Sequence, residues 1–145
     1  MKVIKISDKE VNKFGVGLAK AGYPFLRIVG SKDSVGMRGD AKIFINDVEE
    51  KVHLTGEKPP MIGSVIGVGF ETRSNKVFFT LNGREIFNSV AASRVFEGCG
   101  PHQIYPTFSM GSLEDKIQVN FGQTQFLFNL KSKLNVSSLL KNLIV

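Results

Sequence analysis

One cysteine and two histidines are the residues of this chain that could support nucleophilic or metal chemistry. Cys99 stands three residues before His102, and a neighbouring imidazole can activate a cysteine thiolate. His53 lies in a charged stretch with no serine or cysteine close by. Because catalytic pairs are assembled in space and not by adjacency in the chain, we interpret Cys99 as a small loop cysteine beside a surface histidine. We therefore expect no catalytic residue, no metal site and no cofactor.

Two glycine-rich stretches resemble phosphate-binding loops but lack their chemistry. After Gly15 and Gly17, Lys20 takes the place of the third glycine of a GxGxxG motif, and no helix signal follows. The glycines of residues 63–69 are not followed by the Lys-Ser or Lys-Thr pair of a P-loop. We interpret these glycines as positions of close backbone packing.

The net charge is positive but its distribution does not predict a nucleic-acid site. The chain has 19 Lys and Arg residues against 13 Asp and Glu residues, a formal net charge of +6. Nucleic-acid binding needs a basic stripe interleaved with exposed aromatic residues. Here the basic residues are spread along the chain, and most aromatic residues alternate in a way that is typical of a core. We expect no nucleic-acid partner.

Length and composition suit one soluble domain. The chain has 145 residues, of which 42% are hydrophobic and 22% charged, which is globular composition and not that of a disordered chain. A single cysteine excludes an intramolecular disulfide. No apolar run approaches the ~20 residues of a membrane span, and the N-terminus lacks the features of a signal peptide. We expect a cytoplasmic protein, with the nucleus as the alternative, and no membrane insertion.

Alternating apolar residues predict short β-strands along most of the chain. The clearest case is residues 64–88, a predicted three-stranded antiparallel meander, because Asn82-Gly83 is a strong hairpin signal. No alternation of strands with long helices is present, so we predict an all-β fold, a sandwich or barrel, and not a parallel sheet. Further strands are expected at residues 14–19, 43–45, 104–110 and 116–121.

The strand pattern also predicts the core and the division of the chain. Five residues should face the space between two sheets: Val77, Phe79, Ile117, Val119 and Phe121. We expect residues 1–130 to form the β-sandwich and residues 131–145 to form a tail. Helical spacing of apolar residues at 139–144, with Ser137 as N-cap, predicts a short C-terminal helix. That helix would either dock on the sandwich or contact a partner.

Four motifs in order resemble the SPRY domain family. Residues 63–70 (GSVIGVGF) resemble its G-D-V-I-G-x-G strand, and residues 77–83 (VFFTLNG) resemble its F-F-T-x-N-G hairpin. Residues 104–107 (IYPT) and 119–123 (VNFGQ) match two later motifs. The resemblance covers about residues 1–130. The spelling is closest to SPRY domains of Ran-binding-protein-M-like ligase scaffolds and of membrane-tethered ubiquitin-ligase adaptors.

The chain departs from this family pattern in three places. Ser64 replaces the usual Asp, and residues 37–40 (MRGD) stand where those relatives have a Tyr-His pair, so no familiar ligand carries over. Family members usually have an aromatic-rich strand before the first G-x-G strand, and only residues 1–6 correspond to it here. We therefore expect a missing or shortened N-terminal strand and an unpaired sheet edge that favours dimerisation or aggregation.

The resemblance implies a bent antiparallel β-sandwich with no catalytic apparatus. SPRY domains bind a short peptide or a partner surface through loops at one end of the sandwich. The leading hypothesis is thus a non-enzymatic protein-interaction module, the recognition part of a ubiquitin-ligase or signalling scaffold in a multi-subunit complex. Two alternatives stay open: a glycan-binding sandwich, which would need an exposed aromatic platform in a chain without Trp, and an enzyme that uses Cys99.

We expect the binding surface in three loops that the resemblance brings together. Aromatic residues and Arg dominate protein interfaces, and residues 23–27 carry both. The loops should form a shallow, partly apolar groove with Arg27 or Arg38 at its rim, where an extended peptide carrying a carboxylate would gain a charge-assisted contact. Arg38→Glu should then weaken binding by more than about tenfold and leave thermal stability nearly unchanged. The alternative is that Tyr23 and Phe25 plug the end of the sandwich. The candidate residues are Tyr23, Pro24, Phe25, Arg27, Met37, Arg38, Asp40, Gly111, Ser112 and Leu113.

Overall fold

The computed structural model describes residues 2–5, 8–52, 62–130 and 143–144, and nearly all of its regular structure is β-strand. One short helix, α1 (Val90–Ser93), and short 3-10 helices at Asp8–Lys13, Arg94–Phe96 and Pro101–Gln103 complete it. The strands are β1 (Lys2–Lys5), β2 (Gly15–Lys20), β3 (Ser34–Arg38), β4 (Ile43–Ile45), β5 (Val48–Glu50), β6 (Ile66–Glu71), β7 (Lys76–Leu81), β8 (Arg84–Ser89), β9 (Ile104–Ser109), β10 (Lys116–Gln118) and β11 (Leu143–Ile144).

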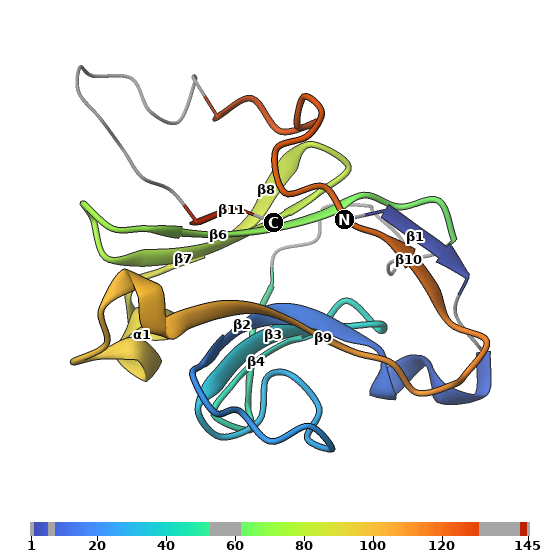
Figure 1. Ribbon diagram of the computed structural model, residues 1–145, viewed down its shortest axis with the longest axis horizontal. Helices are drawn as coiled ribbons and strands as arrows, with labels where there is room; N and C mark the ends of the chain where they lie inside the picture. Colours follow the sequence, from blue (N-terminus) through green and yellow to red (C-terminus); the bar gives the residue numbers. More distant parts are fainter. Residues whose placement is uncertain (1, 6–7, 53–61, 131–142, 145) are drawn as a thin grey trace.

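Two antiparallel sheets pack face to face, with a small third sheet beside them (Figure 1). The lower layer in Figure 1 has the strand order β5-β4-β3-β2-β9, and the upper layer has the order β11-β6-β7-β8. The third sheet pairs β1 with β10. The predicted antiparallel β-sandwich is therefore confirmed.

The predicted meander of residues 64–88 is confirmed as β6, β7 and β8. Leu81 pairs with Arg84, so two residues make the turn between β7 and β8. These residues, Asn82 and Gly83, have φ angles of 49° and 81°. Both angles are positive, as a type I′ turn requires, which is why Asn-Gly marks this hairpin in the sequence.

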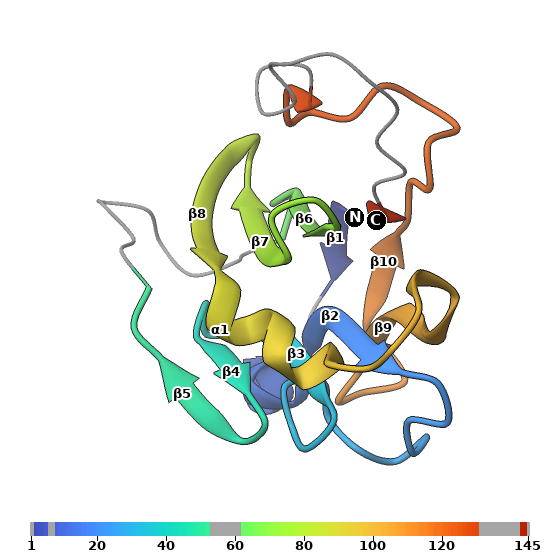
Figure 2. The ribbon, with the colours of Figure 1, turned by 90° about the vertical axis from the view of Figure 1, so that its left-hand side faces the viewer.

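The core lies between the two main sheets. Val77 and Phe79 are completely buried there, as predicted, and Ile117 and Val119 are half-buried and pack against the same cluster. The short helix α1 closes one end of the sandwich (Figure 2), where its N-cap Ser89 accepts a hydrogen bond from Ala92 N–H. Three side chains from this end enter the core: Ala92, Val95 and Phe96.

Phe121 does not belong to the core, so its predicted burial was wrong. Its side chain is 55% exposed. β10 ends at Gln118, and Asn120 then folds the chain into a turn by accepting hydrogen bonds from Gly122 N–H and Thr124 N–H. The period of two holds only while the strand continues, and here side-chain hydrogen bonds replace the ladder.

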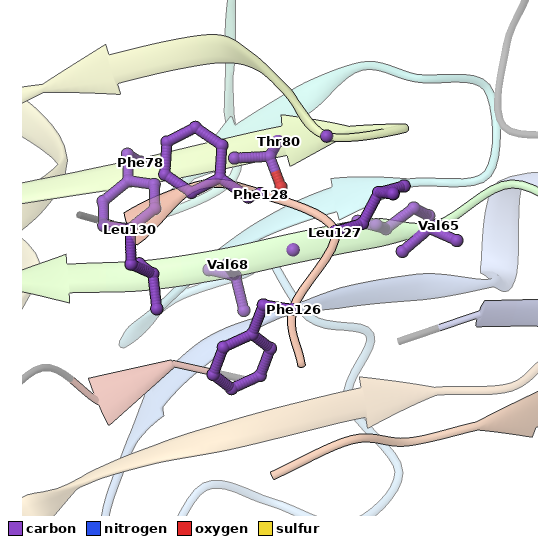
Figure 3. A pocket seen from close by; sticks show the side chains of 11 residues that line it. Val65, Val68, Phe78, Thr80, Phe126, Leu127, Phe128 and Leu130 are labelled. Carbon is purple, nitrogen blue, oxygen red and sulfur yellow. The ribbon is translucent and has the colours of Figure 1, made fainter. Parts of the chain in front are cut away.

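Residues 126–130 lie over the outer face of the four-stranded sheet (Figure 3). The Phe128 ring lies 5.8 Å from the Phe78 ring, centroid to centroid, and Phe78 is buried as a result. Between this segment and the sheet is an apolar pocket of about 30 Å³ (Figure 3). That volume holds about one water molecule, so we interpret the pocket as a packing gap.

The two ends of the chain differ in how far the structure tests them. Most of the helix predicted at 139–144 falls outside the described residues, but Leu143–Ile144 form β11 beside β6, so no helix extends to these two residues. At the other end β1 pairs with β10, and Lys2 also bridges to Val65. The unpaired edge expected from a shortened N-terminal strand stays a prediction.

Candidate functional site

The loop that joins β2 to β3, residues 21–33, lies across the outer face of the five-stranded sheet (Figure 1). Two glycines make room for it. A Cβ at Gly15 would lie 2.6 Å from Cγ1 of Val29, and a Cβ at Gly36 would lie 2.8 Å from the same atom. Val29 is completely buried against them. Gly15 of β2 and Gly36 of β3 therefore leave room for this loop to pack on the sheet, and Gly15 does not belong to a nucleotide-binding turn.

Hydrogen bonds hold the base of the loop while its tip faces solvent. The Tyr23 hydroxyl donates to the carbonyl oxygen of Ile28 at 2.5 Å, and Val29 N–H donates to Oγ of Ser109 at 3.3 Å. Tyr23 is half-buried, but Phe25 is 100% exposed. The alternative in which both aromatic residues plug the sandwich is therefore excluded for Phe25.

An open groove of about 860 Å³ lies between this loop and the outer side of β9. Residues 22–28 form one wall, and β9 with Met110 forms the other. Phe25 and Leu26 are almost fully exposed, and Tyr105 and Met110 are about half exposed. Exposed apolar and aromatic side chains around a hollow are typical of protein-interaction surfaces.

The charged side chains that line the groove are all positive: Lys13, Lys20 and Arg27. Lys20, at the end of β2, pairs with Ile104, the first residue of β9. Gly15, at the start of β2 and two residues after Lys13, pairs with Ser109, the last residue of β9. The two lysines therefore lie toward opposite ends of the groove. The ammonium of Lys20 lies 3.4 Å from the Asp33 carboxylate, a partly exposed ion pair that stabilises little.

The first of the three predicted loops is the one that forms the groove. Tyr23, Pro24, Phe25 and Arg27 all line it. The opposite wall was missed because β9 lies far from this loop in the sequence and reaches it only by pairing with β2. One signal in the sequence could have indicated this wall. Alternation along residues 104–110 places Tyr105 and Thr107 on the face of β9 that points away from the core.

The predicted residues Gly111, Ser112 and Leu113 form a turn next to the groove but do not line it. The Asp115 carboxylate accepts hydrogen bonds from Gly111 N–H at 2.9 Å and Ser112 N–H at 3.1 Å, which fixes the turn and leaves Leu113 fully exposed. The following residue, Glu114, forms a 2.6 Å ion pair with Lys5 of β1. The hydrogen bond that Lys5 donates to Glu114, together with the positive charge of Lys5, lowers the pKa of Glu114.

The predicted residues Met37, Arg38 and Asp40 also lie outside the groove. Met37 is completely buried in the core, so the prediction that it forms part of the binding surface was wrong. Both Met37 and Arg38 belong to β3, which β2 separates from β9. Asp40 accepts a hydrogen bond from Lys42 N–H at 3.2 Å and shapes the turn after β3.

Arg38 packs on an aromatic ring. Its guanidinium carbon lies 3.7 Å from the centroid of Phe44, and its Nε is buried with no hydrogen-bond partner among the described residues. We expect Arg38→Glu to lower the free energy of unfolding by about 1 kcal/mol, the usual size of a cation–π contact. Urea unfolding measures this change. The free energy of unfolding of Arg38→Lys should lie between those of the wild type and Arg38→Glu, because lysine keeps the charge but loses the planar stack.

This expectation reverses the one from the sequence, in which Arg38→Glu weakens binding and leaves stability unchanged. A ligand of the groove should bind the Arg38→Glu variant within about twofold of its affinity for the wild type, because screened charges outside a site contribute little. If the Arg38→Glu variant is as stable as the wild type but binds the ligand more than about tenfold more weakly, Arg38 is part of the binding site and this expectation is wrong.

Of the three residues considered for catalysis, the structure describes Cys99 and His102. Cys99 is half-buried and packs against the core, whereas His102 is exposed. His53 lies outside the described residues. Within the described part of the chain, no group of three or more His, Cys, Asp or Glu side chains could hold a metal ion. No helix there is long and apolar enough to cross a membrane.

Comparison with known proteins agrees with the motifs and the sandwich. A sequence profile of the SPRY domain matches residues 3–124. The chain belongs to the SPRY domain family. SPRY domains are generally non-enzymatic modules of protein–protein interaction. This SPRY domain thus has the two sheets of its family, with residues 126–130 and β11 beyond the matched part.

Curated relatives of this SPRY domain are fungal proteins named ssh4. The chain is 32% identical over 132 residues to protein ssh4 of Aspergillus clavatus and 32% identical over 127 residues to protein ssh4 of Neurospora crassa. Both alignments cover 86% of this chain and 23% of the relative. Protein SSH4 of Coccidioides immitis is 29% identical over 131 residues. The chain therefore spans about a quarter of the length of these relatives.

Proposed function

We propose that this SPRY domain binds an extended segment of a partner protein in the groove between residues 22–28 and β9. The observation that carries the proposal is the fully exposed apolar tip of an anchored loop, Phe25 and Leu26, beside a hollow of about 860 Å³. Apolar side chains held out to solvent by a fixed backbone lose little entropy on binding, so they suit a preformed interface.

Side chains, and not strand addition, should carry this recognition. Among the described strands, β9 is one of the two edge strands of the five-stranded sheet, and Pro106 lies in its middle. Proline has no N–H to donate, and proline on an edge strand opposes the addition of another strand. Selectivity would then come from the groove walls, chiefly from Phe25, Leu26 and Met110.

We also propose a setting for this activity. The ssh4 relatives are about four times as long as the region that this chain matches, which supports a recognition domain carried by a larger protein. Recognition of substrates or partners for a ubiquitin-ligase or signalling scaffold, in the cytoplasm or nucleus, is the role that the family resemblance favours. Peptide binding by the isolated domain does not depend on this setting and is tested separately.

The test is a peptide-array screen with the purified domain, run beside a glycan array, followed by titration of the selected peptides. Leu26→Ala should weaken peptide binding by at least about tenfold, the loss expected for an anchor residue. Leu113→Ala is the matched control, because it removes the same exposed side chain from the neighbouring turn. It should bind within about twofold of the wild type, since scattered surface side chains contribute little.

Both variants should unfold at the temperature of the wild type, because both leucines are exposed. The proposal is wrong if Leu113→Ala loses binding while Leu26→Ala retains it, since the turn would then be the site. A hit on the glycan array that peptides cannot displace would favour the lectin-like alternative, for which Tyr105 and Phe25 offer exposed aromatic surface.

A further inference from the structure

The groove has an electrostatic character that narrows the chemistry of its partner. Among the residues that the structure describes, its lining includes three cationic residues, Lys13, Lys20 and Arg27, and no Asp or Glu. The Asp33 carboxylate lies 3.4 Å from the Lys20 ammonium but does not line the groove. In the part of the chain that the structure describes, Arg27 has no ion pair with an acidic side chain. A groove lined by one sign of charge attracts ligands of the opposite sign and repels those of the same sign.

The cations are spaced along the groove and not gathered at one point. Lys13 lies just before β2 and Lys20 is the last residue of β2, and a strand rises about 3.3 Å per residue, so their backbones are roughly 20 Å apart. Arg27 lies on the loop wall, beside the exposed Phe25 and Leu26. An extended peptide of about six residues spans the distance between the two lysines.

We infer that the groove selects an acidic partner segment: an extended stretch with a large apolar side chain in its middle and Asp or Glu on both flanks. The apolar side chain contacts Phe25, Leu26 and Met110. One flanking carboxylate pairs with Arg27, and the others lie near Lys13 and Lys20, which keep the partners that they have in the structure. This inference rests on the proposed function, because it names the ligand class of the same groove.

Three synthetic peptides of about ten residues test the inference. All have a central Phe, with Glu, Gln or Lys at the flanking positions, and a fluorophore at one end for anisotropy titration with the full chain. The Glu peptide should bind at least about tenfold more tightly than the Gln peptide in about 0.05 M salt, and the Lys peptide should bind most weakly. The difference should shrink in about 0.5 M salt, where screening is stronger.

Variants of the protein locate the effect. Arg27→Glu should weaken the Glu peptide by at least about tenfold and strengthen the Lys peptide, since the sign of the nearest charge is reversed. Lys32→Glu is the matched control: Lys32 is an exposed cation of the same loop that does not line the groove. It changes the net charge equally and should shift binding by less than about twofold, because charges outside the contact are screened.

Each other outcome separates this inference from the function on which it rests. If the Glu and Gln peptides bind equally and Leu26→Ala weakens both, the groove binds peptides but the acidic selectivity is wrong. If Lys32→Glu weakens the Glu peptide as much as Arg27→Glu, the effect belongs to net charge and the inference is also wrong. If no peptide binds, or binding survives in Leu26→Ala, both the inference and the proposed function are overturned.

Discussion

Replacing Phe79 by alanine should lower the free energy of unfolding by about 3–5 kcal/mol, the range for deleting a buried Phe. Phe79 is completely buried in β7, pairs with Val68 of β6, and lies 6.1 Å from the ring of Phe87 on β8, centroid to centroid. The truncated side chain would leave a cavity where both sheets meet, and the strands cannot move to fill it. Urea unfolding of both proteins measures the difference.

Phe25→Ala is the control for this prediction, since it removes the same side chain from a position that is 100% exposed. It should change the free energy of unfolding by less than about 0.5 kcal/mol. If Phe79→Ala is too unstable to fold, Phe79→Leu should still fold, with a cost of about 1.5 kcal/mol. A loss below about 1 kcal/mol for Phe79→Ala would mean that the inward face of β7 has been assigned wrongly.

Gly17→Ala should cost about 3 kcal/mol or more, at the upper end for an inserted core methyl. A Cβ at this position would overlap the carbonyl oxygen of Val35 and would lie 2.7 Å from Cα of Gly36. Both neighbours are backbone atoms of β3, so no side-chain rotation relieves the overlap and β2 must separate from β3. A thermal melt followed by circular dichroism should show a lower unfolding temperature.

The loss for Gly17→Ala is compared with the same substitution at Gly22. In the described part of the chain, no atom outside its immediate neighbours lies within 4 Å of a Cβ at Gly22, whose φ is +78°. Gly22→Ala should therefore carry only the backbone strain of a positive φ, about 1–2 kcal/mol. A variant at Gly22 that is less stable than the one at Gly17 would contradict the steric account of the bare face of β2.

Local patterns in the sequence predicted the parts of the fold that depend on neighbouring residues. The hairpin at Asn82-Gly83 follows from the positive φ angles that these two residues tolerate. The buried face of Val77 and Phe79 follows from the period of two along a single strand. The loop at residues 23–27 follows from the loss of alternation after β2, and four of its five residues were proposed for the binding surface and line the groove, while their role in binding stays a prediction.

The sequence did not predict, or predicted wrongly, the contacts between segments that lie far apart in the chain or depend on side-chain packing. Alternation places Phe78 opposite Phe79, but only the structure shows that residues 126–130 bury it. Arg38 has the composition of an interface residue, yet pairing of β3 with β4 stacks it on Phe44. Phe121 continues an apolar alternation, yet the hydrogen bonds of Asn120 turn it out of the sheet.

The candidate site shows the same division. The sequence by itself determined one wall of the groove, because exposed apolar residues after a strand break are visible in a local window. The tertiary structure decided the other wall and the spacing of the cations along the groove, since β9 and Lys13 reach this loop only through strand pairing across long stretches of chain. Such pairing depends on the combined burial of both sheets, which no local pattern of residues specifies.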